Sequence, residues 1–319
     1  MDKIAVVILN WNQAHLTIEC LRSVLKSRLD NKVSLEIVVV DNNSQDNSVK
    51  MFKNLKLELE NSIKIRNCKL KIIVNNDNLG FTGGNNIGIR YALKDEADFV
   101  FILNNDTEIK NDCILELWKT FSKNENIGIV APKIYYAPGF EFHKDRYKES
   151  DLGKVIWFAG GKIDWNNILG QHIGVDEVDK GQFNIMKRVD FVSGCAMMVK
   201  KEVFKKIGLL DERYFLYLED LDFCHRVAKS GFKILFDPKA IVWHKNAGSS
   251  ASGSKLQEYY ITRNRLLFGQ KHASLKMKLL LLKEALRILM SDNKIKREAI
   301  RNFFLRRFGH KDISIISII

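Results

Sequence analysis

The sequence predicts an α/β fold with a mostly parallel central sheet, helices on both faces and a helical extension at the C-terminal end. Three observations lead to this prediction. Short apolar runs rich in β-branched residues alternate with segments in which apolar residues recur at helical spacing. Polar clusters follow most of these runs, as they do where an open parallel sheet binds ligands. A Gly/Ser/Ala-rich stretch at residues 247–254 then precedes a basic helical part.

Four strands are expected in the first part of the chain, at residues 4–9, 35–40, 70–74 and 99–103. Segments with helical spacing follow the first and the third of them. The strand at 99–103 is apolar at every position, which is typical of a strand buried on both faces of a sheet. The alternation of strands and helices indicates β-α-β units.

The middle of the chain changes character after a fifth expected strand at residues 127–131. Residues 138–185 are charged, aromatic and glycine-rich, which predicts a lobe inserted over the site. The later elements are expected as a strand at 189–199 interrupted at Ser193 and Gly194, a helix at 200–207, a helix that begins at Glu219 and Asp220, and short strands at 232–236 and 240–243.

The C-terminal part carries most of the positive charge. Twelve Lys and Arg residues stand against four Asp and Glu residues from Lys271 to the end, out of a net charge of +13. Residues 274–291 predict an amphipathic helix with a basic face and an apolar remainder. We therefore expect a main domain at 1–250, with the insertion at 138–185, and a basic helical extension at 251–319.

Several classes of protein fit poorly. The charge is concentrated in one tail without interleaved aromatic residues, so a nucleic-acid partner is not expected. The five cysteines are an odd number with no C-x-x-C spacing, which favours a reducing compartment. No apolar run reaches the roughly 20 residues that span a bilayer. The first strand begins without a leader of signal-peptide type, so we expect a cytoplasmic location.

The polar clusters define a candidate site. A parallel sheet places its strand ends along one edge, so clusters far apart in the sequence converge there. Asp41 offers a carboxylate to a base or ribose, or it caps a helix. The stretch from Leu79 to Gly88 contains four glycines, which let backbone amides approach a phosphate. Its spacing matches neither G-x-G-x-x-G nor the phosphate loop with Gly-Lys-Ser/Thr.

Three further groups bring acid–base and metal chemistry. Asp106 offers a hard oxygen ligand suited to Mg²⁺ or Mn²⁺. His244 either completes a metal site or is structural, and its position at a strand end leaves both readings open. Glu219 and Asp220 either stabilise a helix N-terminus through its dipole or supply a general base.

Six motifs, in this order, resemble the family 2 glycosyltransferases of GT-A fold, especially their rhamnosyltransferase-like branch. They are VVILNWN, VVVDNNSQDNS, NNDNLGFTGGNNIG, FILNNDTEI, VSGCAMMVKKEVFKKIGLLDERYFLYLEDLDFCHR and YYITRN. The resemblance covers residues 4–268 and implies a Rossmann-like nucleotide-sugar-binding sheet. It also implies that the insertion lies on the acceptor side.

The resemblance implies roles for individual residues. Asn10 and Asp41 would contact the nucleobase. The glycine-rich stretch would line the nucleotide through Leu79, Gly80, Gly84 and Asn85. Asn105 and Arg263 would bind the nucleotide nearer the diphosphate. Asp106 takes the place of the last acid of the D-x-D motif and would hold Mg²⁺ or Mn²⁺ with His244. Asp220 would be the catalytic base, supported by Glu219. The first acid of D-x-D is Asn104 here, a weaker ligand without charge.

The implied activity is inverting transfer of a sugar from a UDP- or dTDP-sugar to a hydroxyl of a glycan or lipid-linked acceptor, in cell-surface polysaccharide synthesis. The basic C-terminal helix either binds an anionic membrane surface, as a peripheral protein on the inner face of the cell membrane, or packs on the main domain. Two alternatives remain. One is a catalytically weak or inactive nucleotide-sugar-binding protein, and the other is a nucleotidyltransferase, which usually has a glycine-rich loop where NWNQ stands.

Overall fold

The computed structural model describes residues 1–60, 68–246 and 253–311. Most of the Gly/Ser/Ala-rich stretch, residues 247–252, lies outside the described residues. The strands are β1 (Asp2–Asn10), β2 (Val33–Asp41), β3 (Cys68–Val74), β4 (Phe99–Asn104), β5 (Thr107–Ile109), β6 (Ile127–Tyr136), β7 (Ile156–Phe158), β8 (Gly161–Asp164), β9 (Leu169–His172), β10 (Lys187–Arg188), β11 (Ala196–Lys200) and β12 (Lys233–His244). The α-helices are α1 (Ala14–Leu25), α2 (Ser48–Glu60), α3 (Gly80–Lys94), α4 (Cys113–Phe121), α5 (Lys201–Ile207), α6 (Glu219–Lys229), α7 (Lys255–His272), α8 (Leu275–Leu289) and α9 (Lys294–Phe304).

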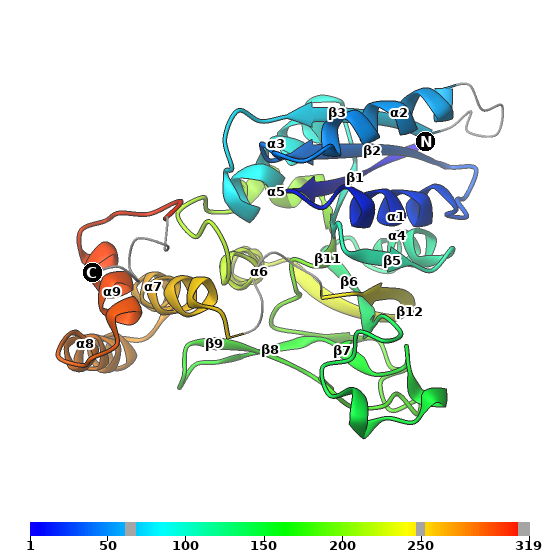
Figure 1. The fold of residues 1–319 in the computed structure, drawn as a ribbon. Helices are drawn as coiled ribbons and strands as arrows, with labels where there is room; N and C mark the ends of the chain where they lie inside the picture. The colour runs from blue at the N-terminus through cyan, green and yellow to red at the C-terminus, as the bar shows by residue number, and fades with distance from the viewer. Residues whose placement is uncertain (61–67, 247–252, 312–319) are drawn as a thin grey trace.

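One central sheet organises the chain (Figure 1). Its strand order is β10-β12-β6-β11-β4-β1-β2-β3, with β5 added to β12 and β7 to β6. β1 pairs in parallel with β2 and β4, and β2 pairs in parallel with β3. β11 runs antiparallel between β4 and β6. The predicted α/β fold with a mostly parallel sheet is therefore confirmed, with antiparallel strands in its second half.

Helices cover both faces of the sheet, and small residues let them approach. Neighbouring side chains of a strand point to opposite faces. A Cβ on Gly84 of α3 would lie 2.4 Å from Leu9, and one on Gly88 would lie equally close to Val7. On the other face, Thr17 of α1 donates a hydrogen bond to the side chain of Asn10. Two glycines of the glycine-rich stretch therefore serve helix–sheet packing.

Three predicted elements differ from the structure. The short strands at 232–236 and 240–243 are one strand, β12, whose register to β6 shifts between Asp237 and Ile241. The Asp237 carboxylate accepts hydrogen bonds from Thr120 and from the Lys239 amide, so it anchors the bulge. In the segment 189–199, the strand β11 begins only at Ala196. The glycine-rich loop is shorter than expected because α3 already begins at Gly80.

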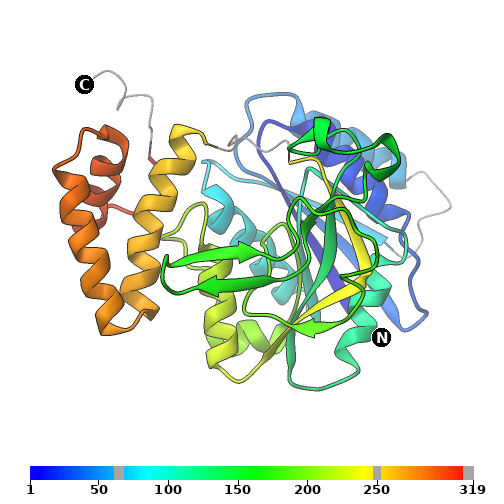
Figure 2. The same cartoon turned by 90° about the horizontal axis from the view of Figure 1, so that it is seen from below.

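The insertion and the C-terminal helices flank the sheet at different places. The insertion supplies β7 and the hairpin β8–β9, which Figure 1 shows below the central sheet. The helices α7, α8 and α9 gather at one side of the molecule, as the second view also shows (Figure 2). The sequence did not predict α9. Among the described residues, no helix has both the length and the hydropathy needed to cross a bilayer.

Candidate active site

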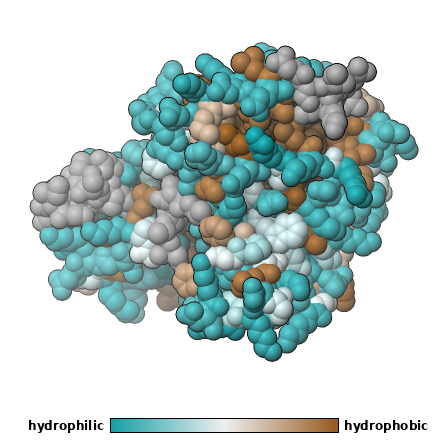
Figure 3. Space-filling view, turned by 45° about the vertical axis from the view of Figure 1, so that its right-hand side comes forward, coloured by the Kyte–Doolittle hydropathy of each residue, from teal (hydrophilic) through white to brown (hydrophobic). Residues whose placement is uncertain are grey.

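A cavity of about 710 Å³ opens at the carboxyl edge of β1 and β4. Its walls come from segments that the sheet brings together from most of the chain. Hydrophilic residues cover most of the face shown in Figure 3, with hydrophobic ones gathered in patches between them. The residues of predicted function that line the cavity are Gly80, Asn105, Asp106, Glu219, Asp220 and His244.

Pairing of β5 with β12 brings Asp106 and His244 together. Thr107 lies opposite His244 in this pairing, and the Lys245 amide donates to the backbone carbonyl of Asp106. The Asp106 Oδ1 and His244 Nε2 atoms are 3.1 Å apart, and both side chains are buried. Burial disfavours the charged ring, but neighbouring Cys195 and Asp106 raise the pKa of His244 above its ordinary value.

This pair fits a hard divalent cation that is also held by a diphosphate. Mg²⁺ typically takes few protein ligands at about 2.0–2.1 Å in octahedral geometry, so adjacent ligands lie about 3 Å apart. The separation between Asp106 and His244 agrees with that spacing; the same distance is a hydrogen bond when the ring is protonated, so a cation bound there would replace the proton on Nε2. No group of three or more His, Cys, Asp or Glu side chains arranged for metal binding occurs in the described part of the chain. The remaining ligands of such an ion would come from the substrate and water.

Two carboxylates at the start of α6, Glu219 and Asp220, bring acid–base chemistry to the cavity. Asp220 Oδ2 accepts a hydrogen bond of 3.0 Å from the Gly194 amide, and its Oδ1 accepts from the Leu221 amide. Burial raises the pKa of Asp220, although these amides act against the shift. Glu219 is buried, and its Oε2 has no hydrogen-bond partner. Burial and the adjacent Asp220 charge raise the pKa of Glu219 well above its ordinary value.

The backbone just before these carboxylates is strained. Phe215, Tyr217 and Leu218 have φ values of 64°, 69° and 65°, a region that non-glycine residues rarely adopt. Gly80 makes room for this loop, because a Cβ there would lie 2.5 Å from the Phe215 ring. The Thr82 amide donates to the Phe215 carbonyl. Strained backbone of this kind persists where the surrounding structure fixes it, often at functional sites.

Asn10 and Asp41 lie beneath the cavity and not on its wall. Both are fully buried, and Asn10 Nδ2 donates to Asp41 Oδ1 at 2.8 Å. The other Asp41 oxygen accepts from the Ser44 amide. Their neighbour Asn42 does line the cavity and was missed by the sequence analysis. Its side chain bonds Asn78 and the Gly80 carbonyl, so it organises the turn before α3.

Several residues with predicted roles lie elsewhere. Gly84 and Asn85 are buried within α3, and Leu79 is exposed, but none of the three lines the cavity. Arg263 also lies away from the cavity wall. Its guanidinium donates to the backbone carbonyls of Arg213, Tyr214 and Gly309, so the structure does not bring it to the place expected for a leaving diphosphate.

Aromatic side chains form a wall that the motifs did not reveal. Trp157 and His172 of the insertion and Phe191 line the cavity, and the Trp157 ring meets the His244 ring edge-on at 4.6 Å between centroids. Desolvation lowers the pKa of His172 to about 4, so this ring is neutral at physiological pH. The aromatic and glycine-rich composition of residues 138–185 pointed to the segment but to no single residue.

Solved structures share this fold. GalNAc-T7 with UDP, GalNAc and Mn²⁺ superposes with a TM-score of 0.58 at 21% identity, over 81% of this chain and 48% of that one. A mannosyltransferase from Pyrobaculum calidifontis in complex with GDP-Man and Mn²⁺ superposes with a TM-score of 0.55 at 14% identity, over 95% of this chain and 74% of that one. These likenesses confirm the predicted GT-A fold.

Sequence comparison points to the same group. The low-salt glycan biosynthesis hexosyltransferase of Haloferax volcanii is 28% identical over 235 residues, which are 73% of this chain and 64% of the relative. A dTDP-rhamnosyl transferase of Shigella flexneri is 27% identical over 64% of each chain. Both alignments span less than two thirds of the relative's length. The model of glycosyl transferase family 2 matches residues 5–208, and the chain therefore belongs to that family.

Proposed function

We propose that this protein transfers a sugar, with inversion, from a nucleotide-diphosphate donor to a hydroxyl group of a glycan or lipid-linked acceptor. The observation that carries the proposal is that one cavity is lined both by a metal-binding type of pair, Asp106 and His244, and by a carboxylate that can act as base, Asp220. A single displacement needs a base on the acceptor side and no protein nucleophile. A role in cell-surface polysaccharide synthesis is part of the proposal, and the names of the relatives, one of which is a glycan biosynthesis hexosyltransferase, favour a role in glycan synthesis.

Asp220 is the proposed base. Its raised pKa keeps it a better proton acceptor than an ordinary surface aspartate, and the Gly194 amide fixes its orientation. It takes the proton of the acceptor hydroxyl as that oxygen attacks the anomeric carbon. Glu219 stands beside it, and its raised pKa favours a neutral carboxyl that can donate a hydrogen bond to the acceptor.

Asp106 and His244 are the proposed protein ligands of Mg²⁺ or Mn²⁺. When bound, such an ion neutralises charge that develops on the departing diphosphate. Asn104, the last residue of β4, and Asn105, the next residue, line the same cavity wall and are placed to contact the donor as neutral hydrogen-bonding groups. Of the nucleotides, UDP and dTDP are proposed. Asn10 and Asp41 would support the binding of the nucleobase from beneath the cavity, and Asn42 would face the nucleobase from the cavity wall.

The aromatic wall is the proposed acceptor side. Trp157, His172 and Phe191 present apolar ring faces, and sugar rings pack their C–H faces against such groups while hydroxyls bond polar neighbours. The wall belongs largely to the insertion at residues 138–185, whose distinct composition therefore makes it the place where acceptor preference is set.

A membrane surface is proposed as a further partner because α8 exposes an apolar stripe. Leucines and a methionine recur at spacings of three and four residues on one face, with exposures from 44% to 81%; they are Leu275, Leu279, Leu282, Leu286 and Met290. The basic residues Lys276, Lys283 and Arg287 flank this stripe. Like charges would oppose pairing of two copies along this seam, whereas anionic lipid attracts them.

Flotation with vesicles tests the membrane partner. The doubly substituted protein L279S/L286S should float less than the wild type with phosphatidylcholine vesicles that contain phosphatidylglycerol. Leu57→Ser is the matched control, because Leu57 is an equally exposed leucine on α2. Equal flotation of all three proteins, or flotation that ignores phosphatidylglycerol, would contradict the proposal.

The transfer reaction is tested with donors and metal together. A thermal-shift screen with UDP, dTDP and GDP, with and without Mn²⁺, should show a Mn²⁺-dependent stabilisation by UDP or dTDP. Asp106→Asn should lose the metal-dependent part. Transfer or hydrolysis assayed with a panel of nucleotide sugars then separates an enzyme from a binding protein. Nucleotide stabilisation without turnover of any donor would favour the inactive binding protein, and pyrophosphate release from a nucleoside triphosphate would favour a nucleotidyltransferase.

A further inference from the structure

We propose that Arg263 and Asn264 of α7 are positioning residues that hold the strained loop 213–218 and thereby fix the orientation of Glu219 and Asp220. The proposal rests on the transfer function above for its kinetic effect, but its structural part does not. The two residues are fully buried, and they lie in the C-terminal helices and not in the sheet.

Asn264 binds the loop through its side-chain amide. The Nδ2 atom donates to three backbone carbonyls, those of Tyr214, Leu216 and Tyr217, at 3.0, 2.8 and 2.8 Å. One NH₂ group has only two hydrogens, so two of the three carbonyls share one hydrogen, and all three lie around the same nitrogen. This convergence occurs only if the loop folds tightly around the amide. Asn264 therefore defines the shape of the loop.

Arg263 fastens the start of the same loop. Its Nη2 donates to the carbonyls of Arg213 and Tyr214 at 2.9 and 2.8 Å, and its Nε donates to Asn264 Oδ1 at 3.0 Å. The last of these bonds orients the Asn264 amide so that its NH₂ group faces the loop. The guanidinium also lies over the Tyr260 ring, 4.8 Å from its centroid. Arg263 and Asn264 thus act as one unit.

The loop needs such support because of its backbone. Left-handed φ values at non-glycine residues cost about 1–3 kcal/mol each, and three of the four residues before Glu219 have them. Without the converging donors, the carbonyls of this loop would be buried without partners, or the loop would relax to ordinary φ values. The first outcome costs stability; in the second the start of α6 would turn, and the Asp220 carboxylate would leave the Gly194 amide.

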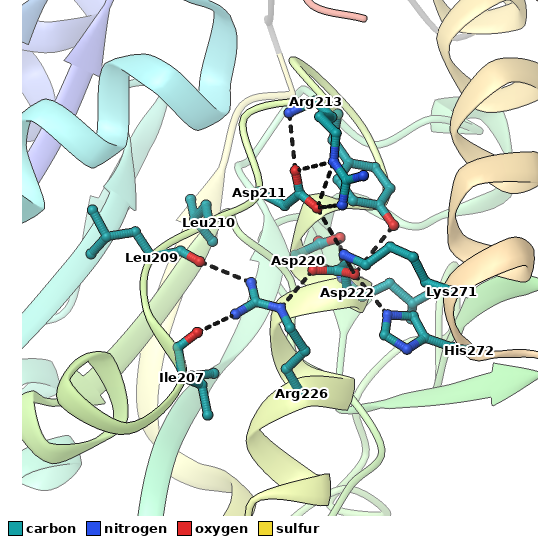
Figure 4. A network of polar contacts seen from close by, with 12 residues as sticks. Ile207, Leu209, Leu210, Asp211, Arg213, Asp220, Asp222, Arg226, Lys271 and His272 are labelled. Atoms are coloured by element: carbon teal, nitrogen blue, oxygen red, sulfur yellow. Dashed lines mark hydrogen bonds and ion pairs between the residues drawn. The ribbon is translucent and has the colours of Figure 1, made fainter. Parts of the chain in front are cut away.

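A second set of contacts joins the same elements (Figure 4). Lys271 of α7 forms ion pairs with Asp211, just before the loop, and with Asp222, just after the carboxylates. Arg226 reaches Asp222 at 2.8 Å and also donates to the Ile207 carbonyl. Contacts from both α7 and α6 therefore hold the loop. In the proposal, α7 positions Glu219 and Asp220 and does not itself touch the substrate.

The test compares two buried asparagines of the C-terminal helices. Asn264→Asp keeps the size of the side chain but removes the donors to the loop. The control Asn302→Asp changes a buried asparagine of α9 whose amide bonds Tyr259 and Glu298 and not the loop. We expect Asn264→Asp to lower kcat about 10- to 100-fold, with the KM for the donor little changed. Asn302→Asp should keep the wild-type kcat.

Hydrogen–deuterium exchange gives a readout that does not need activity. Amides of residues 211–222 should exchange faster in Asn264→Asp and in Arg263→Lys, while those of β1 and β4 stay protected, and Asn302→Asp should exchange like the wild type. Unchanged exchange in residues 211–222 of both α7 variants would overturn the proposal, as would a wild-type kcat in Asn264→Asp. Faster exchange in a protein that turns over no donor would uphold the positioning role and reject the proposed transfer.

Discussion

Two clusters of residues at the cavity differ in how completely their polar groups are hydrogen-bonded. The sheet-edge cluster consists of Asn10, Asp41, Asn42 and Asn105, and the loop cluster consists of Phe215, Tyr217, Leu218, Glu219 and Asp220. In the sheet-edge cluster each side chain bonds a protein neighbour. In the loop cluster the backbone is strained, Glu219 Oε2 has no hydrogen-bond partner, and both carboxylates have raised pKa values.

The difference distinguishes a preformed surface from one whose formation costs folding free energy. A fully bonded cluster at the ends of parallel strands is rigid before any ligand arrives, which suits recognition of a constant group such as a nucleotide. A buried carboxylate with a raised pKa is unfavourable for folding and useful for proton transfer. We therefore expect changes in the loop cluster to affect turnover, and changes in the sheet-edge cluster to affect donor binding.

The largest effect is expected from Asp220→Asn. The amide has the same shape but accepts no proton, so kcat should fall by about 1,000-fold or more while nucleotide binding stays near the wild type. Loss of the buried charge favours the folded state, but the Gly194 or the Leu221 amide then faces an NH₂ group and loses its acceptor, so the melting temperature should change little. Steady-state kinetics and thermal shift with UDP check this. Turnover within tenfold of the wild type would contradict the assignment of turnover to the loop cluster, because that cluster would then lack the base.

Asp222→Asn should give the largest loss of stability. It leaves Lys271 and Arg226 partly buried without their carboxylate, at a cost of about 3 kcal/mol. Burial would raise the pKa of Asp222, but His272, Lys271 and Arg226 lower it, so its stabilisation is present above about pH 4 and is lost as the pH falls further. Denaturant unfolding at pH 7 and pH 3 measures both effects. A difference between variant and wild type that does not shrink at pH 3 would contradict this explanation.

Asn42→Ala should have a smaller effect and a different kinetic signature. Asn42 makes hydrogen bonds with Asn75, Asn78, Leu79 and Gly80, and their loss should loosen the turn before α3. We expect the KM for the donor to rise about tenfold, with kcat within about threefold of the wild type. Initial-rate kinetics against donor concentration distinguish the two parameters. A loss confined to kcat would show that the two clusters are not functionally separate.

The smallest effect is expected from Glu219→Gln. Burial and the adjacent Asp220 charge raise the pKa of Glu219 well above its ordinary value, which favours the neutral carboxyl, and glutamine resembles that form. The variant should keep most of the wild-type kcat, far more than Asp220→Asn. Its pH profile should retain an acid limb above about pH 4, set by the raised pKa of Asp220. If Glu219→Gln were inactive and Asp220→Asn active, Glu219 would be the base and Asp220 the supporting residue.

The sequence predicted the first half of the sheet well for a physical reason. Buried parallel strands read as continuous apolar runs, and β1, β2 and β4 extend the predicted segments by only a few residues. The meeting of Asp106 with His244 was one of two readings that the spacing left open, and the resemblance favoured it. It depends on β5, a strand of three residues whose pattern is too short to recognise alone.

Other features were hidden because they depend on tertiary contacts. The bulge in β12 depends on a bond between Asp237 and Thr120 of α4, so the strand looked like two. Arg263 was assigned to the diphosphate from the resemblance alone, whereas its guanidinium donates to backbone carbonyls. The apolar positions of α8 predicted either a membrane-binding face or a packed one, and many of them are exposed.

The turn after α9 reaches back into the body of the protein. Gly309 accepts a hydrogen bond from Arg263 through its carbonyl, and the Lys311 amide donates to the hydroxyl of Tyr260. Shortened versions of the chain that stop before Gly309 would therefore disturb the residues that support Asp220, whatever their effect on membrane contact. A loss of activity after trimming of the last helices would therefore not by itself report on membrane contact.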